Sequence, residues 1–237
     1  MGGSYAVIKF KTIPMPSVFV LEAELPRDVI ESTNKYLDDL LQQDDRKTAA
    51  DTLVGQIQKG EQLRIDSEDD ELINLSATLR SIAAKYISEF FTQTGQQLLT
   101  DRSVQIEELW SVHSYEGDYN PIHDHGTETI MGVSCTTWTK VPEQIKNLPS
   151  PLENTFKYNN ASGCCDGFLE FVYGQNSVLD KERLKPTQAM ILKPEVGKIY
   201  FFPSWLQHMV YPFKGDGERR TVAANFNCYP VGYEENN

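Results

Sequence analysis

The feature that most constrains the fold is a change in hydrophobic pattern near residue 102. Before it, the stretches 25–43 and 71–95 carry apolar side chains at the spacing of one face of an α-helix. After it, the chain consists of short runs rich in β-branched and aromatic residues, separated by Gly, Pro and Asn. Such runs are typical of a sandwich or barrel of short strands. Helices followed by strands predict an α+β protein whose helices pack on one face of a β core.

Three other segments have weaker patterns. Residues 5–24 alternate in part and contain Pro14 and Pro16, which favours two short, interrupted strands. Residues 42–70 are polar and acidic, so we expect a loop with at most a short helix. Residues 142–166 form a long polar stretch, and long loops in compact domains often serve a binding site. Whether this loop acts as a lid is left open by the sequence.

Composition limits the partners of the chain. The formal net charge is −12 and the 22 Lys and Arg are scattered, whereas a protein that follows nucleic-acid phosphates needs a basic face. No apolar run approaches the roughly 18 residues of a membrane span, and the N-terminus lacks the basic-then-apolar order of a signal peptide. The four cysteines contain no CxxC pair, so we interpret them as reduced, structural thiols. We therefore expect a cytoplasmic protein (in the host cell if viral) with no membrane or nucleic-acid partner.

Three of the four histidines fall in the second half in a pattern that indicates a metal site. His123 and His125 stand two positions apart in YNPIHDHG, and on an extended segment both rings point to one face while Asp124 points to the other. His208, in IYFFPSWLQHMVYPF, offers a third imidazole from a distant strand. Iron(II) oxygenases use three protein ligands on one face. The alternative is that the HDH histidines are simply solvated at the surface.

An arginine follows the last of these histidines on a segment that alternates like a strand. In RRTVAANFN, residues Arg219, Thr221, Ala223 and Asn225 share one face, and Arg220 points the other way. A guanidinium beside a hydroxyl suits a buried carboxylate, because the planar fork binds it through two hydrogen bonds. The alternative is a surface charge on an edge strand.

The segments YNPIHDHG, GKIYFFPSWLQHMVYPF and ERRTVAANFN together resemble the core of the 2-oxoglutarate- and Fe(II)-dependent oxygenases, which is a double-stranded β-helix. The resemblance is to the prolyl-4-hydroxylase-like group found in phages and marine bacteria, and it covers roughly residues 105–230. It implies a jelly-roll, cupin-like core over 102–232. Residues 1–100 then supply N-terminal strands and supporting helices, in a single oxygenase domain over 1–237.

The resemblance also implies roles for individual residues. His123 matches the first metal ligand, His208 matches the distal one, and Arg219 with Thr221 matches the clamp on the far carboxylate of 2-oxoglutarate. The chain departs from the family at His125, where most members have Asp or Glu. Whether His125 or Asp124 completes the metal site stays open, because Asp124 can serve only if the segment is not extended.

Weaker roles are assigned around these residues. Asp124, if it is not a ligand, is expected to orient a ligand ring from behind. Tyr115 and Asn225 are candidates for contacts with 2-oxoglutarate, whereas Trp110 and His113 receive no role.

The implied activity is hydroxylation of a C–H bond with oxidative decarboxylation of 2-oxoglutarate to succinate and CO2. The implied cofactors are Fe(II) and 2-oxoglutarate, and the implied substrate is a prolyl residue of a peptide or protein, or a small molecule. Two alternatives remain from the residues themselves. One is a cupin-like metal protein that does not use 2-oxoglutarate; the other is an inactive jelly-roll binding module, which the loss of a carboxylate at His125 favours.

Overall fold

The computed structural model describes residues 18–98, 101–126, 129–153, 162–173 and 189–232. In chain order its elements are β1 (Leu21–Glu24), α1 (Arg27–Leu40), β2 (Glu61–Arg64), a 3₁₀ turn (Asp70–Leu72), α2 (Ile73–Thr94), β3 (Arg102–Ser114), β4 (Asn120–His123), β5 (Gly132–Lys140), α3 (Glu143–Lys146), β6 (Leu169–Val172), β7 (Ala189–Leu192), β8 (Lys198–Pro203), β9 (His208–Val210) and β10 (Arg219–Pro230).

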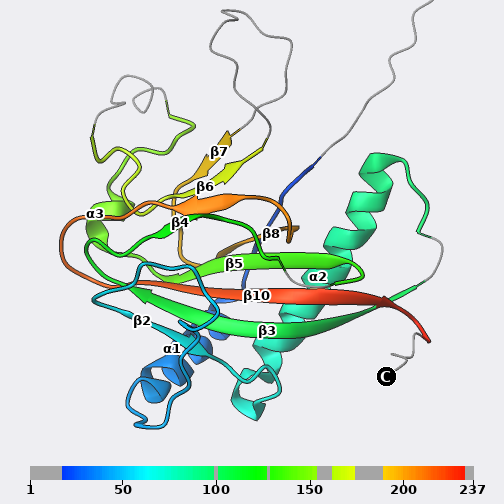
Figure 1. Cartoon of the computed structure of the whole chain (residues 1–237), viewed down its shortest axis with the longest axis horizontal. Helices are drawn as coiled ribbons and strands as arrows, with labels where there is room; N and C mark the ends of the chain where they lie inside the picture. Colours follow the sequence, from blue (N-terminus) through cyan, green and yellow to red (C-terminus); the bar gives the residue numbers. More distant parts are fainter. Residues whose placement is uncertain (1–17, 99–100, 127–128, 154–161, 174–188, 233–237) are drawn as a thin grey trace, which may run out of the picture.

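The strands form two antiparallel sheets. The large sheet has the order β1-β8-β5-β10-β3-β2, and the small sheet has the order β4-β9-β6-β7. Figure 1 shows the small sheet on one side of the large one, with α1 and α2 away from the small sheet. This arrangement is the jelly-roll core with N-terminal supporting helices that the sequence predicts, and the prediction of fold class is confirmed.

Strand β10 lies in the middle of the large sheet, between β5 and β3. Its alternating side chains therefore face two different interiors. Val222, Ala224 and Phe226 join the core under the helices, whereas Thr221 and Ala223 line a pocket between the sheets. The strand is buried on both faces along most of its length, and its buried polar residues Asn225 and Asn227 make hydrogen bonds.

The two helices cover the large sheet through one apolar stripe each. Helix α1 buries Val29 and Leu37, and α2 buries Leu75, Leu79 and Ile87. Each fully buried leucine contributes about 1.5–3 kcal/mol. The end of α2 is set by Gly95, which takes the left-handed conformation at φ 67°, a common conformation for the residue that ends a helix.

A second apolar cluster fills the space between the two sheets. Its largest buried members include Trp138, Phe168, Phe202 and Phe213. This cluster closes part of the inter-sheet space and leaves a pocket beside it. Among the described residues, no helix combines the length and the apolar character needed to cross a membrane.

Some expectations for the loops need correction. The segment 42–70 is not simply a loop, because Glu61–Arg64 forms β2 at the edge of the large sheet and Leu63 is buried. Its pattern is too short to recognise, since the strand depends on pairing with β3. Of the strands expected at 5–24, only β1 falls among the described residues, because 1–17 lie outside them. The expected loop 142–166 contains α3, and its part 154–161 lies outside the described residues.

Candidate metal and cosubstrate site

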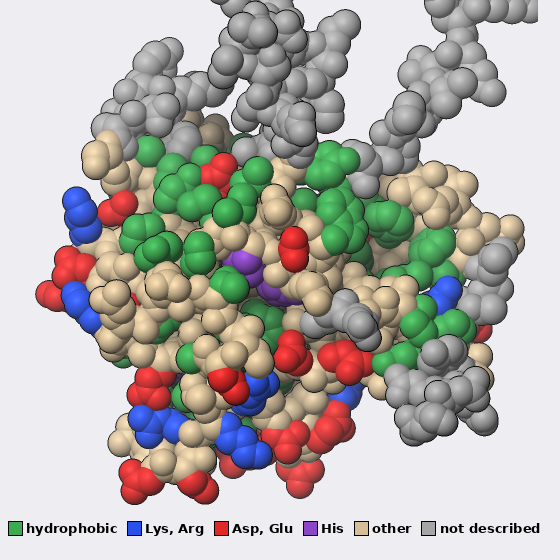
Figure 2. All heavy atoms as spheres, viewed as in Figure 1, with side chains coloured by type: hydrophobic (Ala, Val, Ile, Leu, Met, Phe, Trp, Pro, Cys, Tyr) green, Lys and Arg blue, Asp and Glu red, His purple; other side chains and the backbone are tan. Residues whose placement is uncertain are grey.

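A pocket between the two sheets collects most of the polar residues that the sequence singles out. It encloses about 480 Å³, part of which is open to solvent. Purple histidine side chains are visible in a hollow in the middle of the face shown in Figure 2. The lining comes from both sheets and consists of Trp110, Val112, Asn120, His123, His125, Cys135, Thr136, Leu169, Phe202, His208, Val210, Arg219, Thr221 and Ala223.

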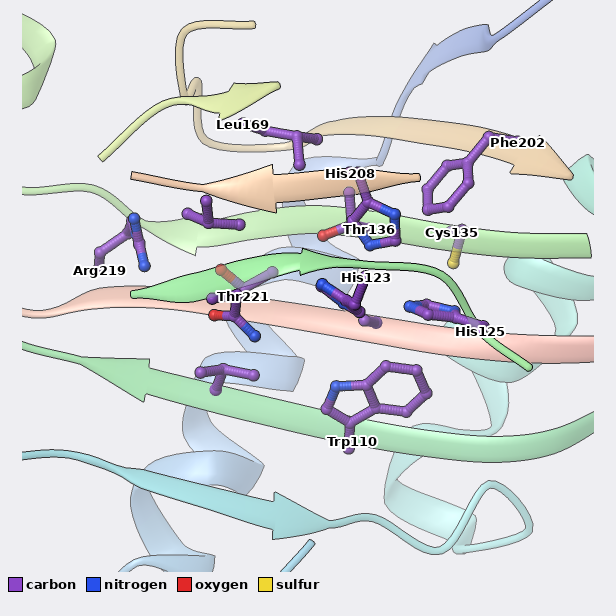
Figure 3. A pocket seen from close by; sticks show the side chains of 14 residues that line it. Trp110, His123, His125, Cys135, Thr136, Leu169, Phe202, His208, Arg219 and Thr221 are labelled. Atoms are coloured by element: carbon purple, nitrogen blue, oxygen red, sulfur yellow. The ribbon is translucent and has the colours of Figure 1, made fainter. Parts of the chain in front are cut away.

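The three histidines predicted to bind metal converge in this pocket. His123 ends β4 and is the cross-strand partner of His208, which begins β9. His125 follows two positions later, and its backbone N–H donates to the carbonyl oxygen of Ser204 at 2.9 Å. One ligand nitrogen from each ring lies within 4.8 Å of the other two, and Figure 3 shows the rings grouped together.

Hydrogen bonds fix which nitrogen of each ring faces the centre of this cluster. The Nδ1 atom of His123 lies 2.7 Å from the carbonyl oxygen of Pro121, and Nδ1 of His208 lies 3.0 Å from that of Leu206. A carbonyl only accepts hydrogen bonds, so both Nδ1 atoms carry the proton. The Nε2 lone pairs of these two rings are therefore left for a metal ion.

His125 obtains the same tautomer from side chains instead of carbonyls. Its Nδ1 lies 2.6 Å from Oδ1 of Asn225 and 2.8 Å from Oγ of Ser134. Asn225 was expected to contact 2-oxoglutarate; the structure places it behind a histidine ring, and it does not line the pocket.

The site favours neutral imidazoles, the form that binds metal. Burial and the other two histidines lower the pKa of His208 to about 3, and a backbone hydrogen bond opposes them only in part. Burial also lowers the pKa of His125 to about 4, against the hydrogen bond to Asn225, and it lowers the pKa of His123. All three rings are therefore uncharged at neutral pH, with one nitrogen of each ring free of a proton.

Asp124 and Tyr115 do not join the pocket. Asp124 is exposed on the opposite face of the HDH segment, as expected for an extended chain, and each ring Nδ1 contacts other groups. It therefore neither completes the cluster nor orients a ring by a hydrogen bond. Tyr115 lies in a separate hollow with Lys59 and Glu116, because the chain turns between β3 and β4.

Arg219 is a fully buried cation at the end of the pocket opposite His125 (Figure 3). Its Nη1 donates to the carbonyl oxygens of Gly167 (3.0 Å) and Tyr211 (3.1 Å), and its Nη2 donates to Oγ of Ser114 (3.2 Å). Its Nε has no hydrogen-bond partner among the described residues. Burial lowers the pKa of Arg219 to about 10, with Asp118 opposing that effect, so the group is still charged at neutral pH.

The neighbouring Arg220 is paired, in contrast to Arg219. It donates to both oxygens of Glu218, at 2.6 and 3.0 Å, and to Asp38 on α1 at 2.6 Å. Glu218 also contacts Nδ1 of the buried His113 at 2.6 Å. Arg220 and His113 thus belong to a network that attaches α1 to the sheet, on the face away from the pocket.

Two further residues complete the wall. Thr221 lies beside Arg219, as the alternation along β10 predicts. The sequence assigned no role to Trp110, yet its indole lines the pocket and meets the His125 ring edge-on, with centroids 5.6 Å apart. Trp110 faces the pocket because it pairs with Ala223 in the ladder between β3 and β10, and the sequence alone does not give this pairing.

Comparisons with known proteins agree with this geometry. A family model described as "Putative 2OG-Fe(II) oxygenase" matches residues 108–225, a span that holds the three histidines, Arg219 and Thr221. The chain belongs to the 2-oxoglutarate- and Fe(II)-dependent oxygenases. No curated protein sequence is similar enough to this oxygenase to count as a relative.

Solved structures of such oxygenases share its fold. A prolyl hydroxylase from Trichoplax adhaerens, in complex with a peptide of hypoxia-inducible factor, aligns with TM-score 0.53 and 14% identity over 91% of this chain and 84% of that one. HygX from Streptomyces hygroscopicus, with nickel and 2-oxoglutarate bound, aligns with TM-score 0.51 and 10% identity over 91% and 84%. The epimerase SnoN, in complex with Fe³⁺, α-ketoglutarate and nogalamycin RO, aligns with TM-score 0.51 and 13% identity over 88% and 78%. At this identity the likeness establishes the double-stranded β-helix fold.

The residues of this oxygenase fit both cofactors of the family, Fe(II) and 2-oxoglutarate. Three neutral imidazole nitrogens on one side of a pocket are a suitable ligand set for iron. Arg219 offers an unpaired Nε–H beside Nη2, which is the edge that a carboxylate engages with two hydrogen bonds. A buried guanidinium without a carboxylate partner is costly, and a dicarboxylate cosubstrate would remove that cost.

Proposed function

We propose that this oxygenase hydroxylates a C–H bond of a prolyl residue in a peptide or protein, with oxidative decarboxylation of 2-oxoglutarate to succinate and CO2. His123, His125 and His208 hold the iron, and Arg219 with Thr221 binds the remote carboxylate of 2-oxoglutarate. When bound, the iron and 2-oxoglutarate together activate O2, whose two oxygen atoms pass to succinate and to the new hydroxyl group. The whole chain is proposed to act as one oxygenase domain.

The observation that carries this proposal is that a buried, unpaired guanidinium and three inward-facing imidazoles share one pocket. The protein positions the groups that bind the cofactors and excludes water from the pocket. Arg219 is held by two backbone carbonyls, so its Nε edge has little freedom to turn away. Apolar side chains such as Leu169, Phe202 and Val210 line the space between the two ends and exclude water.

A peptide substrate is supported by one of the solved structures that share this fold. The Trichoplax prolyl hydroxylase, which has a similar fold, binds a peptide.

The cofactor assignment is tested by anaerobic titration of the Fe(II)-loaded protein with 2-oxoglutarate, followed by visible absorption. Chelation of the iron by the keto acid is expected to produce a saturable charge-transfer band. Absence of the band in protein that retains iron would favour a metal-binding jelly-roll without 2-oxoglutarate chemistry. That second candidate is supported by His125, which stands where most of the family has a carboxylate.

The substrate assignment needs a separate measurement. Succinate formation is followed with a library of proline-containing peptides and with matched peptides in which alanine replaces proline. The proposal predicts stimulation by particular proline peptides and a gain of one oxygen atom in their mass. A charge-transfer band without any such stimulation would point to a small-molecule substrate.

A further inference from the structure

His125 stands at one end of a line of hydrogen bonds that leads to a carboxylate on the neighbouring strand. Its Nδ1 contacts Oδ1 of Asn225 at 2.6 Å, and Nδ2 of Asn225 donates to Oε2 of Glu108 at 3.0 Å. Asn225 and Glu108 are cross-strand partners in the ladder between β10 and β3. A hydroxyl network joins the line, because Ser134 donates to Oδ1 of Asn225 at 2.8 Å and contacts Oγ of Ser204 at 2.9 Å.

The polarity of this line follows from its carboxylate end. An ionised carboxylate can only accept, so the NH2 group of the Asn225 amide faces Glu108. The amide oxygen of Asn225 then faces His125, and it too can only accept. The proton of the ring must therefore sit on Nδ1 of His125, which leaves Nε2 with its lone pair toward the metal cluster.

The three histidines differ in what stands behind them. His123 and His208 donate to neutral backbone carbonyls, whereas His125 alone is connected to a negatively charged group. Asn225 is 4% exposed, so the connection runs through a buried amide. Asp124 is also near but is exposed and makes no hydrogen bond to a ring, so its charge is screened by water.

We propose that Asn225 and Glu108 are positioning residues that let His125 occupy the place of a carboxylate ligand. The amide fixes the tautomer and rotation of the ring, and Glu108 polarises the amide so that Nε2 becomes a stronger donor. The negative charge that a carboxylate ligand would bring to the iron thus lies two hydrogen bonds away. This inference rests on the proposed function, in which His125 binds the metal.

The first test measures Co(II) affinity of the apoprotein by competition with a chelating indicator dye, in the absence of 2-oxoglutarate. Asn225→Leu is expected to weaken Co(II) binding by about 10–100-fold. Asn227→Leu is the matched control, because Asn227 is equally buried on the same face of β10 but accepts from the backbone N–H of Ile130. Equal losses in the two variants, or an unchanged affinity in Asn225→Leu, would overturn the proposal.

A second pair of variants separates polarity from packing and covers the case in which Asn225→Leu does not fold. The exchange of Glu108→Gln with Asn225→Asp keeps both hydrogen bonds and moves the carboxylate next to the ring. We expect this exchange to bind Co(II) at least as tightly as the wild type, and Glu108→Gln alone to bind more weakly. Glu107→Gln is the control, because Glu107 accepts from Tyr229 instead. If the exchange binds more weakly than the wild type and Glu108→Gln is unchanged, the proposal is wrong.

Nuclear magnetic resonance of the Co(II) protein gives a readout that a general loss of stability would not produce. The ring N–H of His125 is shielded from solvent by its hydrogen bond to Asn225, so it is expected as an exchangeable, paramagnetically shifted signal. Asn225→Leu should lose one such signal, whereas the exchanged pair should keep it. An unaltered set of signals in Asn225→Leu contradicts the proposal. Failure of the wild type to bind Co(II) or Fe(II) would instead contradict the proposed function itself.

Discussion

His123 and His208 are direct cross-strand partners, and their imidazole rings lie with centroids only 4.3 Å apart. Each occupies an end of a short strand in the small sheet, so the ladder between β4 and β9 sets the separation of two ligand nitrogens. The third ring, His125, is brought in by the backbone hydrogen bond to Ser204 after β8. The ligand set therefore depends on the pairing of segments that are distant in the sequence.

Removal of one ring should abolish metal retention. His208→Ala leaves two imidazoles, and two ligands rarely hold a divalent ion. Metal at about 100 times its Kd should stabilise the wild type by about 2.7 kcal/mol, and it should not stabilise His208→Ala. The measurement is thermal unfolding with and without Co(II). The control is His113→Ala, because His113 is buried outside the cluster; it should lose stability yet retain its response to Co(II).

Loss of the guanidinium should weaken the binding of 2-oxoglutarate and leave metal binding unchanged. Arg219→Met removes a charge-assisted contact worth about 1.5–3 kcal/mol, which corresponds to about a 10–100-fold rise in the Kd for 2-oxoglutarate. The charge-transfer titration measures this Kd directly. Arg220→Met is the control, because Arg220 points to Glu218 and α1; its variant should be less stable but bind 2-oxoglutarate normally. Normal affinity in Arg219→Met would contradict the assigned role.

The network behind β10 should make stability depend on pH. Burial by itself would raise the pKa of Glu218, but hydrogen bonds from His113 and Arg220 outweigh it and lower the pKa from 4.5 to about 2. The ionised form is therefore favoured in the folded state. Its contribution is present above pH 4.5 and is lost as the pH falls toward 2, by up to about 3 kcal/mol.

Urea unfolding of Glu218→Gln across this range tests the expectation. The free energy of unfolding of the variant should lie below that of the wild type at pH 7, and the difference should shrink between about pH 5 and pH 2. Glu143→Gln, which changes an exposed carboxylate on α3, is the control and should have little effect. A difference that does not change with pH would mean that the pKa of Glu218 is not lowered.

Gly167 should tolerate no side chain. Its φ is +74°, and a Cβ there would lie 2.5 Å from Cδ1 of Ile145 and 3.6 Å from Nη1 of Arg219. Gly167→Ala should therefore cost about 1–2 kcal/mol for the left-handed backbone and about 1–3 kcal/mol for overpacking. It should also weaken the binding of 2-oxoglutarate, because the Gly167 carbonyl oxygen accepts a hydrogen bond that positions Arg219.

Gly95→Ala is the matched control for this substitution. Gly95 has a similar φ of +67°, and a Cβ there would meet nothing within 4 Å. Gly95→Ala should lose only the stability that the left-handed backbone costs, and it should keep normal affinity for 2-oxoglutarate. Equal destabilisation of the two variants, measured by urea unfolding, would show that the contact with Ile145 relaxes without penalty.

Much of the fold could be predicted from local pattern. The helical spacing before residue 95, the stop at Gly95 and the strand-rich second half all depend on neighbours in the sequence. The strand β2 could not be predicted, because its four residues carry little periodicity and are ordered by pairing with β3. The same limit applies to Trp110, whose place in the pocket depends on its partner Ala223 across the ladder.

The sequence by itself determined which side chains share a face: the HDH spacing separates His123 and His125 from Asp124, and the alternation of β10 separates Arg219 from Arg220. Those relationships are properties of an extended backbone and need no partner strand. Only the tertiary structure decided what each face meets. In the folded chain Asn225 lies behind His125 and does not line the cosubstrate pocket, and Tyr115 lies in a separate hollow. Both positions depend on strand register and on the turn after β3, which are set by packing between distant segments.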